Sequence, residues 1–89
     1  FQHLIIISLN RTSEQEVKNM FNSLEERGAE TNNIKYDVQG GVLKSLTFFT
    51  SYKGVKEHFD LSKVEQNGKD CLLLVQIDEK ALNLDIKCK

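Results

Sequence analysis

The stretch "CLLLVQIDEKALNLDIKC", residues 71–88, decides the fold. When it is folded about Glu79-Lys80, an apolar residue faces an apolar residue at every inner pair, and the two cysteines meet at the open end. A slip of one residue would turn every one of these side chains to the other face, so the register is strongly specified. The sequence therefore predicts an antiparallel hairpin with these pairs: Ile77 with Leu82, Val75 with Leu84, Leu73 with Ile86, and Cys71 with Cys88.

The predicted register places Cys71 and Cys88 at a non-hydrogen-bonded site, where Cα atoms approach to about 4.5 Å. A disulfide accepts that separation. Two states stay open at this point, because the residues do not reveal the redox compartment. The cysteines are either free thiols that pack as small hydrophobic groups or a cross-strand disulfide. A zinc site is not expected, because zinc prefers four N or S ligands and His3 and His58 have no motif partner.

The clearest helix signal covers residues 13–27. Val17, Met20, Phe21 and Leu24 form one apolar stripe at helical spacing. Thr12 or Ser13 can cap the N-terminus, and Gly28 suits the position after the C-terminus. Before this helix, the segment 4–8 is apolar on both strand faces, which is typical of a central strand.

The segment 55–64 distinguishes two folds. As a strand it pairs back across Lys53-Gly54, with Tyr52 facing Val55 and Phe48 facing Phe59. As a helix over 55–65 it would complete a ferredoxin-like βαββαβ arrangement. The apolar spacing favours the strand, and Gly40-Gly41 and Asn67-Gly68 mark further turns.

We therefore predict one α+β domain over 1–89. One amphipathic helix packs on one face of a five- to six-stranded, mostly antiparallel sheet in the order β-α-β-β-β-β-β. The ferredoxin-like βαββαβ fold is the alternative.

Several classes of function are not expected. The net charge is −1, with both signs scattered, whereas nucleic-acid binding normally requires a basic face. No apolar run approaches the roughly 18 residues needed to enter and cross a membrane, and the first residues do not resemble a signal peptide. Enzyme motifs are absent and His58 has no recognisable carboxylate beside it, so we predict no catalytic residue, cofactor site or metal site.

One feature indicates a partner. A single helix covers one face of the predicted sheet, and the other face would carry Leu72 and Leu74, with Phe49. These three residues form the candidate partner surface. The expected partner is a protein or a peptide, or a second copy of the chain, bound through a sheet face or edge. The alternative is that the chain's own loops or a neighbouring domain cover this face.

Residues 12–62 resemble small extracytoplasmic domains of Bacteroidetes envelope proteins, including the C-terminal domains of beta-lactam-sensor-like membrane metallopeptidases. The resemblance lies in a capped helix, a "KY-x-V" strand, a glycine-marked turn and a "YK-x-G" hairpin. The matching residues are Thr12, Ser13, Glu16, Gly28, Lys35, Tyr36, Val38, Gly41, Tyr52, Lys53 and Gly54. All are structural, so no functional residue carries over. The resemblance implies a periplasmic or surface location and favours the disulfide.

The sequence and this resemblance predict a non-enzymatic extracytoplasmic module, periplasmic or secreted, that binds or senses a protein, peptide or envelope component. The alternative is a cytosolic, ferredoxin-like regulatory or ligand-binding domain that acts as a dimer.

Overall fold

A computed structural model describes residues 1–61 and 70–88 of the chain. Within these residues, one helix and six strands follow one another in the predicted order, which confirms the α+β class. The segment 62–69, with the predicted Asn67-Gly68 turn, lies outside the described residues. The elements are β1 (Gln2–Ser8), α1 (Glu14–Glu26), β2 (Glu30–Gln39), β3 (Val42–Tyr52), β4 (Val55–Asp60), β5 (Cys71–Asp78) and β6 (Leu82–Cys88).

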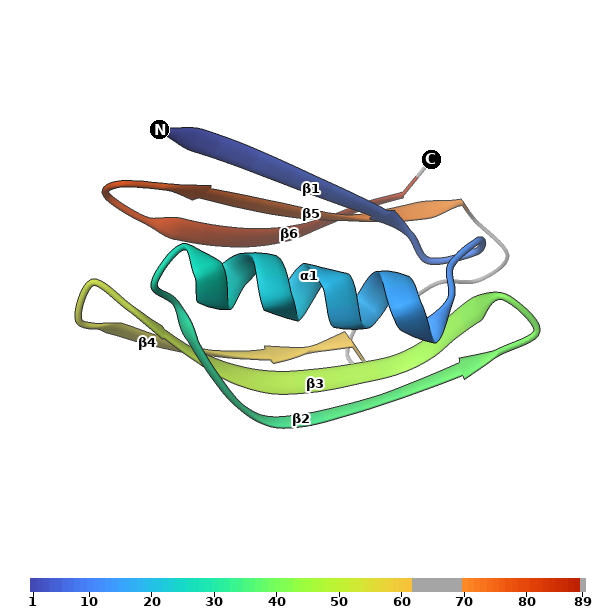
Figure 1. Cartoon of the computed structure of the whole chain (residues 1–89). Helices are drawn as coiled ribbons and strands as arrows, with labels where there is room; N and C mark the ends of the chain where they lie inside the picture. Colours follow the sequence, from blue (N-terminus) through green and yellow to red (C-terminus); the bar gives the residue numbers. More distant parts are fainter. Residues whose placement is uncertain (62–69, 89) are drawn as a thin grey trace.

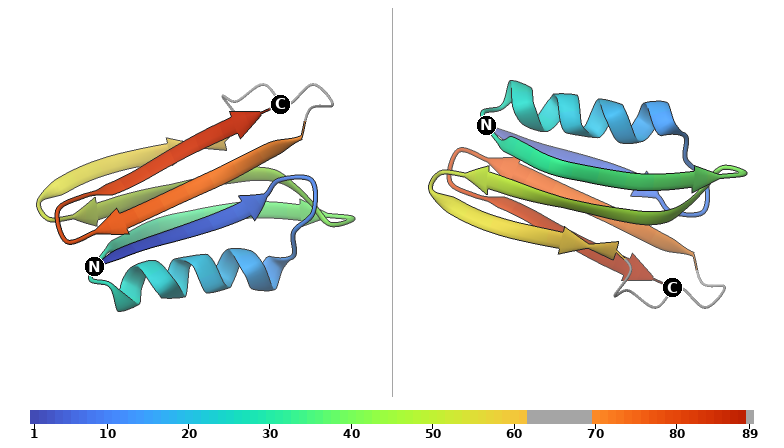
Figure 2. Two further views of the ribbon diagram at one scale, coloured as in Figure 1. Left: turned by 90° about the horizontal axis from the view of Figure 1, so that it is seen from above. Right: turned by 90° about the horizontal axis from the view of Figure 1, so that it is seen from below.

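The strands form two antiparallel sheets of three strands each, rather than one sheet. Their orders are β1-β5-β6 and β2-β3-β4. The two sheets face each other, and α1 lies along the side where β1 and β2 are the edge strands (Figures 1 and 2). The physical reason is burial. Each alternating strand gives its sheet one apolar face, and a helix of 13 residues cannot cover the apolar faces of six strands. The two apolar faces therefore cover each other.

Hydrogen bonds join the two sheets at both ends. At one end, the Leu9 N–H donates to the Cys71 carbonyl (2.9 Å), and the Leu9 carbonyl accepts from the Leu43 N–H (2.8 Å). At the other end, the Tyr52 hydroxyl donates to the Asp78 carbonyl at 2.6 Å. Phe48 is fully buried between the sheets, with its ring 4.9 Å from that of Phe21 on α1. The helix and both sheets thus share one hydrophobic core.

The hairpin of β5 and β6 has the predicted register throughout, from Ile77 opposite Leu82 to Cys71 opposite Cys88. The Asp78 carboxylate closes its turn by accepting from the Lys80 and Ala81 N–H groups at 2.7 and 2.8 Å. These two bonds stabilise the ionised carboxylate and hold the pKa of Asp78 below its ordinary value.

The hairpin of β3 and β4 shows that the ferredoxin-like alternative is wrong. Residues 55–60 form a strand, with Val55 opposite Tyr52 and Phe59 opposite Phe48 as predicted. Lys53 and Gly54 both have positive φ, as a type I′ hairpin turn requires. The rest of the predicted segment, 62–64, lies outside the described residues.

Helix α1 agrees with its sequence signals at both ends. The Ser13 hydroxyl accepts from the Glu16 N–H at 3.2 Å, so Ser13 rather than Thr12 is the N-cap. At the other end, the Ala29 N–H donates to the Leu24 carbonyl and the Gly28 N–H to that of Glu25, both at 3.0 Å, with Gly28 at φ +95°. This is the Schellman arrangement.

Strand β1 differs from its prediction. Among the described strands it pairs with β5 alone, so it is an edge strand and not a central one. Ile7 is buried, but Leu4 and Ile6 point to the outer face and are 54% and 56% exposed. β1 therefore has apolar residues on both faces, although its outer face is exposed to solvent.

Candidate functional site

The cysteines form a disulfide, which decides between the two states that the sequence left open. Cys71 and Cys88 lie opposite each other at the ends of β5 and β6, with their Cα atoms 4.0 Å apart. Cys71 is fully buried, whereas Cys88 is exposed. The bond ties the edge strand β6 to the central strand of its sheet.

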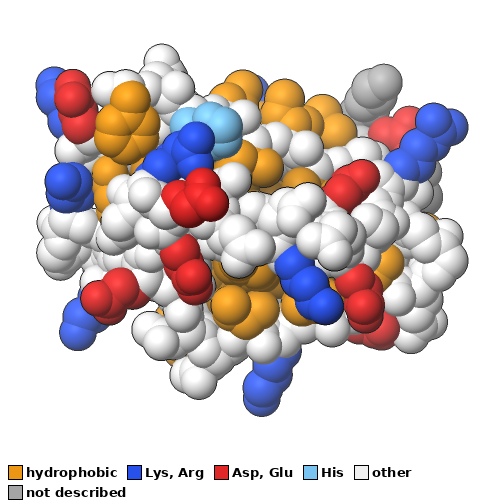
Figure 3. All heavy atoms as spheres, viewed as in Figure 1, with side chains coloured by type: hydrophobic (Ala, Val, Ile, Leu, Met, Phe, Trp, Pro, Cys, Tyr) orange, Lys and Arg blue, Asp and Glu red, His pale blue; other side chains and the backbone are white. Residues whose placement is uncertain are grey.

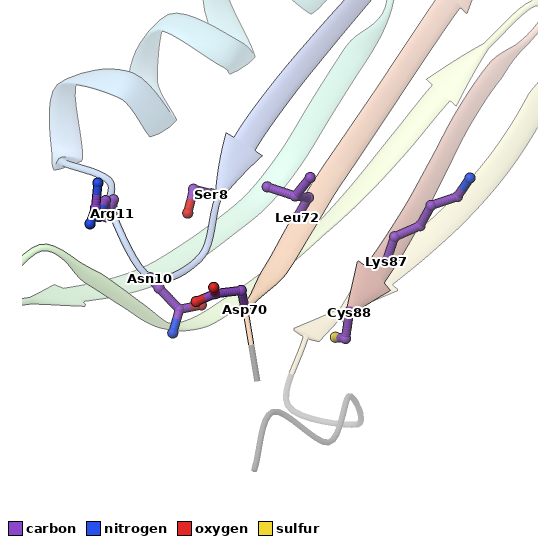
Figure 4. Close-up of a pocket in the computed structure, with 7 residues that line it drawn as sticks. All are labelled: Ser8, Asn10, Arg11, Asp70, Leu72, Lys87 and Cys88. Atoms are coloured by element: carbon purple, nitrogen blue, oxygen red, sulfur yellow. The ribbon is translucent and has the colours of Figure 1, made fainter. Parts of the chain in front are cut away.

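A hollow of ≈ 460 Å³ lies beside the disulfide (Figure 4). Its lining mixes both signs of charge with one apolar side chain: Ser8, Asn10, Arg11, Asp70, Leu72, Lys87 and Cys88. Figure 4 shows Arg11 on the loop after β1 and Lys87 extended along β6, on opposite sides of Leu72. The Asn10 side-chain oxygen is already in use, since it accepts from the Cys71 N–H at 3.4 Å. These groups do not converge on one point, as a site for a small molecule requires.

The three residues of the candidate partner surface lie on two different sheets. Leu72 and Leu74 are on the outer side of β5, while Phe49 is on the outer side of β3. Phe49 stacks on His58 of β4, with ring centroids 4.3 Å apart. The structure therefore separates Phe49 from the two leucines.

The two leucines belong to an apolar row that the sequence reading did not include. Ile6 is the ladder partner of Leu74, and Leu4 lies two residues before Ile6 on the same outer face of β1. Figure 3, viewed from the helix side, shows hydrophobic side chains gathered along the upper rim of the molecule over this strand. Leu4 and Ile6 were missed because β1 was read as a central strand with both faces covered.

A shallow groove of ≈ 470 Å³ runs between β1 and α1. Five consecutive residues of β1, from His3 to Ile7, line one wall, and Glu16, Asn19, Met20 and Ser23 of α1 line the other. Consecutive strand residues point to opposite faces. Residues from both faces of β1 can line the same groove only if the groove runs along the backbone edge of the strand. The groove thus presents the β1 edge that β5 does not use.

β1 also differs from the other three edge strands of the described residues. Edge strands are normally protected against pairing by charges, prolines or bulges. The sequence of β1, "QHLIIIS", contains no Lys, Arg, Asp or Glu, and its ladder with β5 has no register shift. The other edges are protected: β2 has two register shifts, β4 carries Lys56, Glu57 and Asp60, and β6 carries Asp85 and Lys87.

The helical wall of the groove is polar and carries one carboxylate. The Thr12 hydroxyl donates to Oε2 of Glu16 at 3.0 Å, and the Gln15 amide donates to the Asn19 side-chain oxygen at 2.8 Å. Met20, the apolar residue of this wall, is almost fully buried. An extended segment in this groove would therefore meet backbone groups on one side and, on the other, the Glu16 carboxylate beside the Asn19 amide and the Ser23 hydroxyl, which can both donate and accept.

Over residues 1–61 and 70–88, no three or more His, Cys, Asp or Glu side chains are grouped so that they could hold a metal ion. Within the same residues, no helix has the length and apolarity that crossing a bilayer requires. No protein-family model, curated protein or solved structure matches the chain.

Proposed function

We propose that the chain is an exported, non-enzymatic protein-binding module that takes up an extended segment of its partner by strand addition at β1. The observation that carries this proposal is the contrast among the sheet edges. Three edges carry charges or bulges that oppose further pairing, and the fourth carries neither and borders a groove.

Strand addition uses groups that β1 already directs away from its neighbour. In an antiparallel ladder, alternate residues of a strand turn their N–H and C=O groups to opposite sides. β5 takes one set of these groups on β1. The other set faces the groove, where the backbone of an incoming segment can pair with it. Affinity then comes from main-chain hydrogen bonds, and specificity from the flanking side chains.

The disulfide supports the exported location. Structural disulfides persist in the periplasm and outside the cell, whereas cytosolic thiols are kept reduced. The resemblance of residues 12–62 to extracytoplasmic domains of envelope proteins implies the same compartment. The cytosolic alternative relied on a ferredoxin-like fold, and β4 takes the place of the helix that this fold needs.

The test is selection from a phage-displayed library of random linear peptides against the oxidised domain. Ile6→Lys places a charge on the β1 edge, and Val55→Lys is the matched control, because Val55 is 57% exposed on the edge strand β4. We expect enriched peptides to bind the natural domain and Val55→Lys equally, and Ile6→Lys at least about tenfold more weakly. In NMR titrations, the amide signals of residues 2–8 should move most.

Two results would contradict strand addition at β1. One is a library that yields no enriched peptide. The other is a set of peptides whose binding Val55→Lys weakens as much as Ile6→Lys does.

A further inference from the structure

We infer that the segment taken up at β1 alternates aliphatic side chains with cationic or neutral hydrogen-bonding ones, and that Glu16 selects against acidic segments. This inference rests on the proposed strand addition and specifies the chemistry of the partner.

The aliphatic side chains follow from the outer face of β1. A strand added beside β1 continues the sheet, so alternate residues lie on its outer face, directly opposite Leu4 and Ile6. Both side chains are more than half exposed, and Leu74, the ladder partner of Ile6, continues the apolar row on β5. Aliphatic residues at these positions form apolar cross-strand pairs that remove part of this surface from water.

The polar side chains follow from the inner face. Residues of the added strand that lie opposite His3, Ile5 and Ile7 point inward. Figure 2 shows α1 displaced sideways from β1, on the side away from β5, so these residues would face the helix. Glu16, Asn19 and Ser23 meet them, at a spacing that places all three on one side of the helix.

The charge of the helical wall favours cationic segments over acidic ones. Glu16 is the one carboxylate that lines the groove, and no Lys or Arg lines it among the described residues. A Lys or Arg of the incoming segment gains an ion pair with Glu16, whereas an Asp or Glu meets a like charge with no cation to offset it. His3 lies on the strand wall and is the other titratable group there.

The position of α1 also argues against a second copy of the chain as the occupant. A symmetric pairing of two β1 edges would bring the second α1 to the side that the first α1 already occupies, because each helix extends beyond its own β1 (Figure 2). A single extended segment brings no helix with it. The groove therefore fits a strand that is donated alone.

The test compares two blocked synthetic peptides of about eight residues. Both have valine at every second position. Lysine and threonine fill the remaining positions in one peptide, and glutamate and threonine fill them in the other. Binding is measured by fluorescence anisotropy at low salt and about pH 8, where histidine side chains are ordinarily neutral. We expect the lysine peptide to bind about tenfold more tightly than the glutamate peptide.

Glu16→Gln should bring the two affinities to within about a factor of two, since it removes the charge and retains a similar shape. Glu14→Gln is the matched control. It removes a charge from the same helical turn but outside the groove, and it should preserve the tenfold ratio.

The outcomes separate this inference from the proposed function. The charge preference is wrong if the two peptides bind the natural domain with equal affinity, or if Glu16→Gln leaves the ratio of their affinities unchanged. In either case, strand addition is still supported if Ile6→Lys weakens the binding. If neither peptide binds although the library yields peptides that do, the inferred alternation is wrong. If Ile6→Lys has no effect on binding, strand addition itself is wrong. A concentration-dependent dimer that Ile6→Lys abolishes would identify a second copy as the occupant and overturn the inference.

Discussion

Reduction of the Cys71–Cys88 bond should lower the stability of the domain by an amount that the loop length sets. The two cysteines are 17 positions apart. In the chain-entropy model, a cross-link over such a loop removes about 10 cal/mol/K from the entropy of the unfolded chain, which corresponds to about 3 kcal/mol at 25 °C. A ladder of seven residue pairs also holds the native hairpin together, so we expect the loss to arise mainly in the unfolded state.

This free energy converts into a large thermal shift because the chain is short. Unfolding entropies of about 2.1 cal/mol/K per residue give about 190 cal/mol/K for 89 residues. A loss of about 3 kcal/mol then lowers Tm by about 15 °C. The assay is thermal unfolding followed by circular dichroism, with and without a phosphine reductant, and with alkylation and mass spectrometry to count the thiols.

The double variant Cys71→Ala/Cys88→Ala is the control for effects of the reductant itself, and its Tm should not respond. A fully reduced natural domain whose Tm falls by less than about 3 °C would refute the chain-entropy reasoning, because the bond would then constrain nothing that the hairpin does not already constrain.

Three further predictions concern the core, the helix and the hairpin turn. Phe48→Ala should lower the free energy of unfolding by about 3–5 kcal/mol, since Phe48 is fully buried against Phe21; a loss below about 1 kcal/mol in urea denaturation would show that the core lies elsewhere. Ser13→Ala should cost about 1 kcal/mol and Ser13→Asp much less, because aspartate also accepts from the Glu16 N–H; equal losses in the two variants would argue against the cap. The lowered pKa of Asp78 means that the folded state binds this proton less readily than the unfolded state, so its contribution to stability is present above its ordinary pKa of 3.8 and is lost as the pH falls below it. The Tm difference between the natural domain and Asp78→Asn should shrink on acidification through this range, and a difference independent of pH would contradict the assignment.

The local pairing of the strands could be predicted from the sequence, and the reason is visible in the hairpin of β5 and β6. Its side chains alternate with period two, so only one register places apolar residues opposite apolar residues and Cys71 opposite Cys88. The same reasoning placed Phe59 opposite Phe48. Each of these pairs lies within a hairpin, where the turn fixes which strands are neighbours.

The assignment of residues to outer faces could not be predicted in the same way. Strand parity tells which residues of one sheet share a face, and Phe49 and Leu74 were placed together on the assumption of one continuous sheet. The chain leaves the β2-β3-β4 sheet after β4 and enters the other sheet at β5. The alternation of side chains in one sheet does not predict which residues share a face with them in the other, because each sheet has its own inner and outer faces. The separation of Phe49 from Leu74 follows from this change of sheet.

The prediction that β1 is a central strand was wrong, but its sequence does have the composition of a central strand. A strand without charges, and apolar on both faces, is suited to neighbours on both of its edges. The structure supplies one neighbour, β5, and leaves the second edge along the groove beside α1. The edge strands β4 and β6 both carry charged residues. Edge strands without charges are therefore not a general feature of this chain, and β1 is an exception. Leu4, Ile6 and the uncharged edge are therefore explained together if the second neighbour of β1 comes from another molecule.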